Sequence, residues 1–431
     1  MRRAERTPSL RGKTLYPPQR MPPQDPHTPP IALVMVGLPA RGKTYISRKI
    51  SRYLSWLGYQ TRVFNVGNYR RARLGAAQAH AFFDPRNAEG VEARRQLAMA
   101  ALRDMLKWLK GGGQVGIYDA TNTTRDRRRL VLEECDKAGV QVVFVESICD
   151  SAVVEANIRE VKLGSPDYVD MTPEEAAEDF RARIAHYERS YEPLDDPELA
   201  YVKLIDVGRQ VVVNGVEGYL CARLVFFLMN IHTDRRAIWL TRHGESEYNV
   251  QNRIGGDPEL TALGKGYAKN LAAYIQERVP TQQELVLWTS TLRRTWHTAE
   301  PIGREVTQWR VLDEIDAGEC DGMTYDEIRR ERPEEFRARA EDKLRYRYPR
   351  GESYSDVIQR LEPVIVELER QKQPVLVISH QGIIRGLYGY LIGRPQEECP
   401  HIQIPLHTLI EMTPTAYGYE ERRIKLGPEL G

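Results

Sequence analysis

The chain has 431 residues, of which 28% are charged and 41% hydrophobic, and its formal net charge is +2. This length exceeds one ordinary hydrophobic core, so two soluble domains are expected, and the balanced charge favours neither nucleic acid nor an anionic membrane as a general partner. The five cysteines are scattered without a CxxC pair, which argues against a disulfide framework or a cysteine zinc site and favours a reduced, cytoplasmic protein.

The N-terminal segment is rich in proline and charge and has no periodic apolar pattern. We therefore expect a disordered tail over residues 1–30. No apolar segment follows its basic start, so a signal peptide is not expected. No apolar run in the chain is long enough to cross a membrane, so no membrane helix is expected either.

The first ordered element is expected at Ile31–Val36, a continuous apolar run typical of a buried parallel strand. Further strands are expected at Thr61–Val66, Val115–Asp119, Val140–Glu146 and Tyr201–Val207. Helical patterns separate these runs, and one helix start is marked by Thr172 and Glu175, which can form a capping box. The pattern predicts a doubly wound α/β domain over residues 31–232.

A glycine-rich loop, GLPARGKT (37–44), follows the first expected strand and precedes a helical pattern. It fits the G-x-x-x-x-G-K-[ST] pattern, in which backbone N–H groups cradle phosphate oxygens at a helix N-terminus. Lys43 can reach the β- and γ-phosphates of a nucleotide, and the Thr44 hydroxyl can ligate Mg²⁺. The complete pattern in this context makes a chance turn a poor explanation and indicates phosphoryl transfer from ATP.

Other polar residues of this domain are candidates for a metal site and for a binding site of the phosphoryl acceptor. Asp119 ends an expected strand, where a carboxylate can hold hydrated Mg²⁺ or orient an acceptor hydroxyl, although a strand-end Asp alone is more often a loop cap. Arg70 and Arg71 follow the second strand, and Arg183 and Tyr187 share one helix face. Each arginine alone fits a solvated surface, but a converging set would form a phosphate clamp for an anionic acceptor.

The pattern pauses near residues 230–236, and a new apolar strand at Ala237–Leu240 opens a second α/β series. Later strands are expected at Glu284–Trp288 and Val375–Ser379. The second domain is expected to cover residues 236–417 as another doubly wound sheet, and the short charged stretch 418–431 is expected to be a C-terminal tail.

Arg242 and His243 lie in the sequence TRHGES directly after the first strand of this domain, where α/β sites normally lie. A neutral imidazole can attack phosphorus and form a phosphohistidine, and a neighbouring guanidinium can neutralise the phosphoryl oxygens. His380 follows a later strand, and Arg294 could supply a second guanidinium. A four-residue motif such as RHGE occurs easily by chance. Chance is a weaker explanation for His243 and His380 together, because each follows an expected strand.

Two further features complete the expected second site. Glu314 is the candidate acid that protonates the leaving group. Basic residues and tyrosines interleave over residues 339–350, a pattern that can bind single-stranded nucleic acid. Because the run is short and the overall charge balanced, a pocket for the second phosphate of a small bisphosphorylated ligand is preferred, and no nucleic acid partner is expected.

These residues lie in blocks that resemble the bifunctional 6-phosphofructo-2-kinase/fructose-2,6-bisphosphatase family from about Ile31 to Tyr417. The blocks are GLPARGKTYIS (37–47), FNVGNYRR (64–71), DATNTTR (119–125), VKLGSPDY (161–168), TRHGESEYN (241–249), RIGGDPELT (253–261), LDEIDAG (312–318), YRYPRGESY (346–354) and PLHT (405–408). The resemblance implies a P-loop kinase that phosphorylates fructose 6-phosphate at C2 with ATP and Mg²⁺. It further implies a phosphoglycerate-mutase-like histidine phosphatase that removes this phosphate, control of glycolytic flux, and a homodimer.

The resemblance also implies roles for particular residues. The ATP site would comprise Gly37, Ala40, Arg41, Gly42, Lys43, Thr44, Tyr45 and Asn157, with Thr44 and Asp119 for Mg²⁺ and Lys43 and Asp119 as catalytic groups. The fructose 6-phosphate site of the kinase would comprise Arg70, Arg94, Thr121, Lys162, Arg183 and Tyr187. In the phosphatase, His243 would accept the phosphoryl group beside Arg242, Arg294 and His380, with Glu314 as general acid. The rest of the bisphosphate site would comprise Asn249, Gly256, Tyr325, Arg339, Lys343, Arg347, Tyr354, Gln381 and Arg385.

Some positions depart from the family pattern. Ser379 and Gly382 stand where family members commonly carry Cys and Ala, one residue is missing between Cys149 and Asn157, and residues 72–83 differ from the animal forms. Two other functions remain open at this point. One is a different small-molecule P-loop kinase fused to a mutase, and the other is a non-catalytic sensor of fructose 2,6-bisphosphate.

Overall fold

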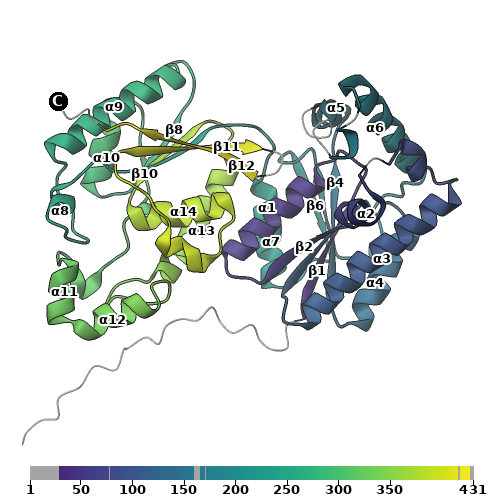
Figure 1. The fold of residues 1–431 in the computed structure, drawn as a ribbon, viewed down its shortest axis with the longest axis horizontal. Coiled ribbons are helices and arrows are strands. Elements are labelled where there is room, and N and C mark those ends of the chain that lie inside the picture. Colours follow the sequence, from purple (N-terminus) through teal and green to yellow (C-terminus); the bar gives the residue numbers. More distant parts are fainter. Residues whose placement is uncertain (1–28, 77, 160–165, 170, 416–417, 428–431) are drawn as a thin grey trace, which may run out of the picture.

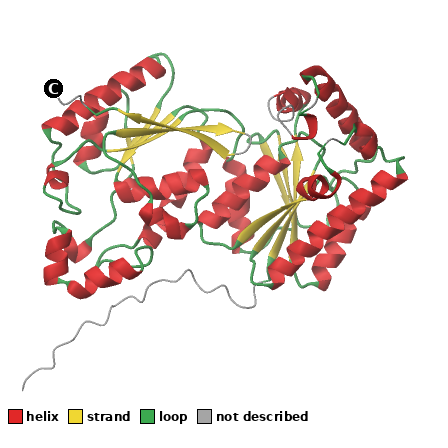
Figure 2. Ribbon diagram, in the orientation of Figure 1, coloured by secondary structure: helices red, strands yellow, loops and turns green. Residues whose placement is uncertain are grey.

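The structure is a computed structural model of the chain, and it describes residues 29–76, 78–159, 166–169, 171–415 and 418–427. The expected tail over residues 1–30 lies almost wholly outside the described residues. Figures 1 and 2 show two α/β lobes, each with helices packed on both faces of a central sheet. Among the described helices, none is both long and apolar enough to cross a membrane.

The N-terminal lobe contains a six-stranded sheet in the order β2-β3-β1-β4-β5-β6. All neighbouring strands are parallel except β6, which is antiparallel to β5. Its elements, with 3₁₀ helices labelled η, are β1 (Ile31–Val36), α1 (Lys43–Trp56), β2 (Thr61–Asn65), α2 (Val66–Leu74), η1 (His80–Phe83), α3 (Ala88–Lys110), β3 (Val115–Asp119), α4 (Arg125–Lys137), β4 (Gln141–Ile148), α5 (Ser151–Asn157), η3 (Pro166–Tyr168), α6 (Pro173–Glu188), β5 (Tyr201–Ile205), β6 (Gln210–Asn214) and α7 (Tyr219–Asn230).

The C-terminal lobe contains a second six-stranded sheet in the order β12-β11-β7-β10-β8-β9. Its elements are β7 (Ile238–Arg242), α8 (Glu247–Val250), α9 (Ala262–Arg278), β8 (Val286–Thr289), α10 (Arg293–Ala299), η4 (Glu300–Ile302), β9 (Thr307–Gln308), η5 (Arg310–Leu312), η6 (Gly318–Cys320), α11 (Tyr325–Glu331), α12 (Pro333–Glu341), α13 (Tyr354–Arg370), β10 (Val375–Ser379), α14 (Gln381–Ile392), η7 (Gln396–His401), β11 (Thr408–Thr415) and β12 (Gly418–Lys425). Strand β11 is antiparallel to both β7 and β12.

Local sequence accounts for the elements that carry the sites. Strand β1 is buried along its whole length, as a continuous apolar run in a parallel sheet requires. Helix α6 begins with the expected capping box, in which Thr172 and Glu175 bond each other's backbone N–H groups. Because β1, β2 and β3 are parallel, the residues that follow them meet at one sheet edge, which is where α/β proteins place their sites.

Two expectations of the sequence need correction. Residues 418–425 are not a tail but strand β12, which pairs with β11. Its mostly charged residues hide the strand pattern because this edge strand is largely exposed. The second expected strand ends at Asn65, and Val66 begins α2, because the Asn65 side chain accepts a hydrogen bond from the Asn68 amide and caps that helix.

The two lobes pack closely through α1 and α7 of the first and α13 and α14 of the second (Figure 1). One hydrophobic core cluster contains residues of both lobes. The Trp56 indole also donates a hydrogen bond of 3.0 Å to the Gly386 carbonyl across the contact. Buried Glu369 pairs with Lys49 and Arg52 of the opposite lobe. The lobes are therefore joined by a packed and charged interface.

Candidate active sites

The glycine-rich loop lies between β1 and α1 and lines a cavity of about 1520 Å³. Gly42 has a φ of 76° and directly precedes α1, so the first amides of this helix face the loop. Gly37 does not line the cavity, and its role in the turn is structural. A Cβ there would lie 2.6 Å from the Ser147 carbonyl oxygen, and its φ of 132° favours glycine.

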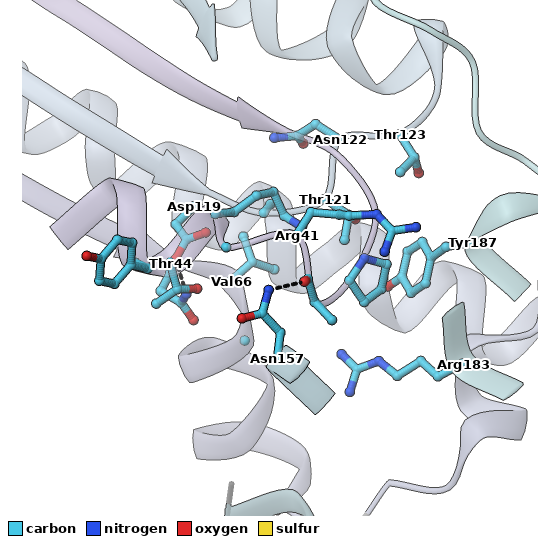
Figure 3. A pocket seen from close by; sticks show the side chains of 18 of the residues that line it. Arg41, Thr44, Val66, Asp119, Thr121, Asn122, Thr123, Asn157, Arg183 and Tyr187 are labelled. Atoms are coloured by element: carbon cyan, nitrogen blue, oxygen red, sulfur yellow. Dashed lines mark hydrogen bonds between the residues drawn. The ribbon is translucent and has the colours of Figure 1, made fainter. Parts of the chain in front are cut away.

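One end of the cavity holds the residues expected to serve nucleotide and metal. The Lys43 ammonium donates a hydrogen bond of 2.6 Å to the Leu38 carbonyl. This contact places the ammonium over the loop. The buried carboxylate of Asp119 accepts a hydrogen bond from Asn65. The Asn157 amide donates 2.9 Å to the Ala40 carbonyl. Thr44 and Asp119 also line this cavity (Figure 3), so it contains both a hydroxyl and a carboxylate.

The opposite end of the cavity is strongly basic. Arg183 and Tyr187 of α6 extend into it, as Figure 3 shows. The other lining arginines include Arg70 from α2 and Arg94 from α3. Burial lowers the pKa of Arg70 and that of Arg94, and the nearby charge of Arg183 lowers both further. Converging guanidinium groups that are partly desolvated form an anion site.

The expected residues of this cavity are largely brought together. Lining residues among them are Ala40, Arg41, Gly42, Lys43, Thr44, Tyr45, Arg70, Arg94, Asp119, Thr121, Asn157, Arg183 and Tyr187. Lys162 lies outside the described residues. The Tyr45 hydroxyl also donates 3.1 Å to the His232 carbonyl, so this residue ties the nucleotide end of the cavity to the linker between the lobes.

A second site lies at the edge of the second sheet, where β7 and β10 end. The imidazole rings of His243 and His380 have centroids 5.2 Å apart. The His243 amide donates 2.9 Å to the Ser379 carbonyl, which fixes one strand end against the other. Parallel pairing of β7 with β10 therefore brings together two histidines that are far apart in sequence.

Hydrogen bonds define the protonation of His243. Its Nδ1 lies 2.7 Å from the Gly244 carbonyl oxygen, and its Nε2 accepts a hydrogen bond of 3.2 Å from Arg294 Nε. Nδ1 thus carries the proton, and Nε2 keeps a lone pair. Complete burial, together with Arg294 and Arg242, lowers the pKa of His243 well below its ordinary value. The imidazole is therefore neutral and nucleophilic at neutral pH.

Further groups surround the two histidines. Burial lowers the pKa of Arg242 to about 10, and its Nη1 donates 3.2 Å to the Ile404 carbonyl. Glu314 accepts amide hydrogen bonds from Gly382, at 3.1 Å, and from Ile315, at 3.0 Å. A Cβ at Gly382 would lie 2.6 Å from Glu314 Oε1, so glycine permits this carboxylate position.

The expected basic cluster forms a wall of connected side chains. Arg339 donates 2.8 Å to the Tyr325 hydroxyl and 2.9 Å to the Tyr348 hydroxyl. Arg385 donates 2.9 Å to the Tyr354 hydroxyl. Burial, together with Arg385 and Arg339, lowers the pKa of Lys343 to about 8.

The structure also shows contacts of the remaining expected residues. Arg347 pairs with Asp356 at the start of α13. The Gly256 carbonyl accepts a hydrogen bond of 2.7 Å from Arg294. Asn249 Oδ1 accepts from Ser246, and Gln381 begins α14 beside His380.

Sequence reasoning missed several residues of both sites. Ser290 lies at the end of β8 and contacts His380 Nε2 at 2.8 Å; its position after a strand was an available signal. Buried Asp167 pairs with Arg70, Arg71 and Arg183. Nothing in the local sequence pattern marked Asp167, because its partners come from α2 and α6.

Comparison with known proteins gives consistent results. The family model described as 6-phosphofructo-2-kinase matches residues 20–235, and that of the histidine phosphatase superfamily (branch 1) matches residues 238–426. A relative from Arabidopsis thaliana, "6-phosphofructo-2-kinase/fructose-2,6-bisphosphatase", is 52% identical over 403 residues. This alignment covers 92% of the chain and 54% of the relative, so the chain spans about half the length of that protein.

The human "6-phosphofructo-2-kinase/fructose-2,6-bisphosphatase 4" is also 52% identical, over 92% of the chain and 85% of that relative. Among solved structures, the alpha-ribazole phosphatase from Shigella flexneri is 26% identical, with a TM-score of 0.40. The match covers 44% of this chain and 96% of the phosphatase chain.

Proposed function

We propose that this chain, which belongs to the 6-phosphofructo-2-kinase/fructose-2,6-bisphosphatase family, makes and hydrolyses fructose 2,6-bisphosphate at the two sites described above. It carries the kinase and the bisphosphatase domain of the family on one polypeptide. One observation supports anionic ligands at both sites. Among the described residues, buried nitrogens of Arg70 and Arg183 in the first site, and of Arg242 and His380 in the second, have no hydrogen-bond partner.

In the kinase, the glycine-rich loop and Lys43 would hold the ATP phosphates, and the basic end would hold the phosphate of fructose 6-phosphate. The C2 hydroxyl would then attack the γ-phosphorus, and ADP would leave. Asp119 would orient that hydroxyl or bind the metal. Oxygen ligands from Thr44 and Asp119 fit Mg²⁺, which would neutralise charge on the phosphates when bound.

In the bisphosphatase, His243 Nε2 would attack phosphorus of the 2-phosphate while the bond to the sugar oxygen breaks. Glu314, as the general acid, would give its proton to the departing C2 oxygen, so that fructose 6-phosphate leaves with a hydroxyl at C2. Arg242, Arg294 and His380 would stabilise the charge on the phosphoryl oxygens. Water would then attack the phosphohistidine, with the Glu314 carboxylate taking its proton, and inorganic phosphate would leave.

The reaction products test this proposal. With ATP and fructose 6-phosphate, the enzyme is expected to form an acid-labile phosphate ester at C2. With fructose 2,6-bisphosphate labelled at the 2-phosphate, it is expected to form an acid-labile phosphoenzyme whose label then appears in inorganic phosphate. Transfer of that label to added 3-phosphoglycerate instead of water would favour the mutase alternative. Binding of fructose 2,6-bisphosphate without either turnover would favour the sensor.

We also propose that the protein is a homodimer joined through the kinase domain. Among the described strands, β6 is an edge of the first sheet. Four apolar side chains of β6 and the following helix α7 are 44–74% exposed: Val213, Tyr219, Phe226 and Met229. An exposed strand edge with an apolar margin favours pairing with a second copy. Sedimentation should give a dimer for the wild type and a monomer for Phe226→Glu. A monomeric wild type would contradict this proposal.

A cytoplasmic location is part of the same proposal. The chain has five free cysteines, four of them buried. Free thiols are the state that reducing compartments maintain.

A further inference from the structure

The short helix η1 places one aromatic ring among the arginines of the kinase cavity. The ring of Phe83 is buried, with 4% of its surface exposed. The guanidinium carbon of Arg183 lies 3.7 Å from the ring centroid, that of Arg70 at 5.4 Å and that of Arg94 at 6.0 Å. Three cationic side chains from three different helices therefore share one aromatic residue.

This arrangement offsets the electrostatic repulsion between the clustered arginines. The same end of the cavity also contains Arg71, and the Asp167 carboxylate pairs with Arg70, Arg71 and Arg183. Like charges brought together with partial loss of water repel one another. The negative face of an aromatic ring attracts guanidinium groups without occupying their N–H donors. Phe83 can thus hold the arginines close together while their donors stay available for an anion.

The position of η1 is itself fixed by contacts with α6 and α3. The His80 amide donates 2.9 Å to Asp179 Oδ1. His80 Nδ1 and His186 Nε2 lie 3.1 Å apart and share a hydrogen bond. Arg94 donates 3.0 Å to the carbonyl of Phe82. These hydrogen bonds anchor η1 to both helices and so set the position of the Phe83 ring.

We propose that Phe83 is a positioning residue for binding of the sugar phosphate in the kinase reaction, because it preorganises the guanidinium groups of Arg70, Arg94 and Arg183. The inference rests on the proposed function of this cavity. Phe83 acts through the arginines, so its removal affects binding of fructose 6-phosphate more than binding of ATP, whose loop lies at the opposite end of the cavity.

Steady-state kinetics of Phe83→Leu test this role. Loss of the ring should raise the KM for fructose 6-phosphate about tenfold, the size expected for a desolvated cation–π contact. The KM for ATP should stay within about twofold, and Phe83→Tyr, which keeps the ring, should restore most of the affinity. The bisphosphatase activity of the same polypeptide should not change and serves as the check on folding.

Phe64→Leu is the matched control. Phe64 is also buried in the kinase domain and contacts one guanidinium, that of Arg62, but it packs in a hydrophobic core cluster and does not line the cavity. Its replacement should leave the KM for fructose 6-phosphate unchanged. Equal increases in both variants, or no increase in Phe83→Leu, would overturn the inference.

A binding measurement separates this inference from the proposed function. Inorganic phosphate should also bind the glycine-rich loop and the bisphosphatase site, which are the same in wild type and Phe83→Leu. Calorimetry with phosphate should therefore show weaker binding at one of several sites in Phe83→Leu, whichever sugar the kinase uses. If wild type binds phosphate and Phe83→Leu binds it less well, but fructose 6-phosphate is not phosphorylated, only the proposed substrate is wrong. If both bind phosphate equally, the role of Phe83 is wrong even when kinase turnover is normal.

Discussion

At the scale of single residues, the chemistry proposed for the second site depends on one neutral imidazole. His243 is buried, and its two ring nitrogens contact Gly244 and Arg294. Both burial and the neighbouring arginines oppose its protonation. An exposed histidine at this position would be half protonated near its ordinary pKa of 6.5 and would lose its nucleophilic lone pair.

A pH profile tests this state of His243. Because the folded-state pKa is lowered, the imidazole stays neutral as the pH falls through 6.5, and phosphoenzyme formation should persist there. Rapid-quench measurement of phosphoenzyme formation between about pH 5 and about pH 8 gives the profile. Arg294→Met removes one cause of the lowered pKa, so its acid limb should move to higher pH. A wild-type rate that halves near pH 6.5 would contradict the assignment.

Local sequence identifies residues of this kind only when they lie in a motif. Lys43 and His243 could be predicted because each follows an apolar strand in a chemically specific loop. The role of Phe83 could not be predicted, and for Ser290 only its position after a strand was a signal. Their partners come from distant segments: the Arg183 guanidinium lies over the Phe83 ring, and His380 contacts Ser290. Such pairs arise from tertiary packing and not from spacing along the chain.

At the scale of elements, the parallel strands were the most predictable part of the fold. The spans of β1, β3 and β10 agree with the apolar runs in the sequence, because a strand buried on both faces must be apolar throughout. Strand β6 is partly exposed and β9 has only two residues, so neither carries that pattern. The missed strands lie at or near sheet edges, where tertiary pairing determines structure more than composition does.

Helix α6 carries Arg183 and Tyr187, and its capping box offers a test at this scale. Thr172→Ala removes the hydroxyl that accepts from the Glu175 amide, at 3.3 Å. The loss should destabilise the helix by about 1 kcal/mol. Amide hydrogen exchange of the first turn of α6 should therefore become faster, while Thr172→Ser should exchange like wild type. Unchanged protection in Thr172→Ala would show that the cap does not stabilise this helix.

At the scale of the whole molecule, α1 connects the first site with the other lobe. It begins with Lys43, and its later residues pack against α14 of the other lobe. Helix α14 in turn begins directly after His380. The interface therefore connects structural elements of both sites, an arrangement that no local sequence pattern predicted.

The buried carboxylate of Glu369 is the electrostatic centre of this interface. Although burial opposes ionisation, Lys49 and Arg52 lower its pKa to about 2. Glu369→Gln leaves buried Lys49 and partly buried Arg52 without this countercharge, which should cost about 3–5 kcal/mol of unfolding free energy. Urea denaturation measures this loss at neutral pH.

Glu398→Ala provides the control, because it breaks an exposed pair with Arg394 and should cost less than about 0.5 kcal/mol. Equal stability of Glu369→Gln and wild type would mean that the charged contact does not hold the lobes together. The carboxylate stabilises the fold above its unfolded pKa, and this contribution should disappear as the pH falls towards about 2.

The central claim is that one chain carries two independent phosphoryl-transfer sites with opposite effects on the same sugar ester. Parallel assay of both activities in Lys43→Ala and His243→Ala tests it most directly. Lys43→Ala should lose synthesis of fructose 2,6-bisphosphate and keep its hydrolysis, whereas His243→Ala should keep synthesis and lose both hydrolysis and the phosphoenzyme. Loss of kinase turnover in His243→Ala, with hydrolysis intact, would contradict the account.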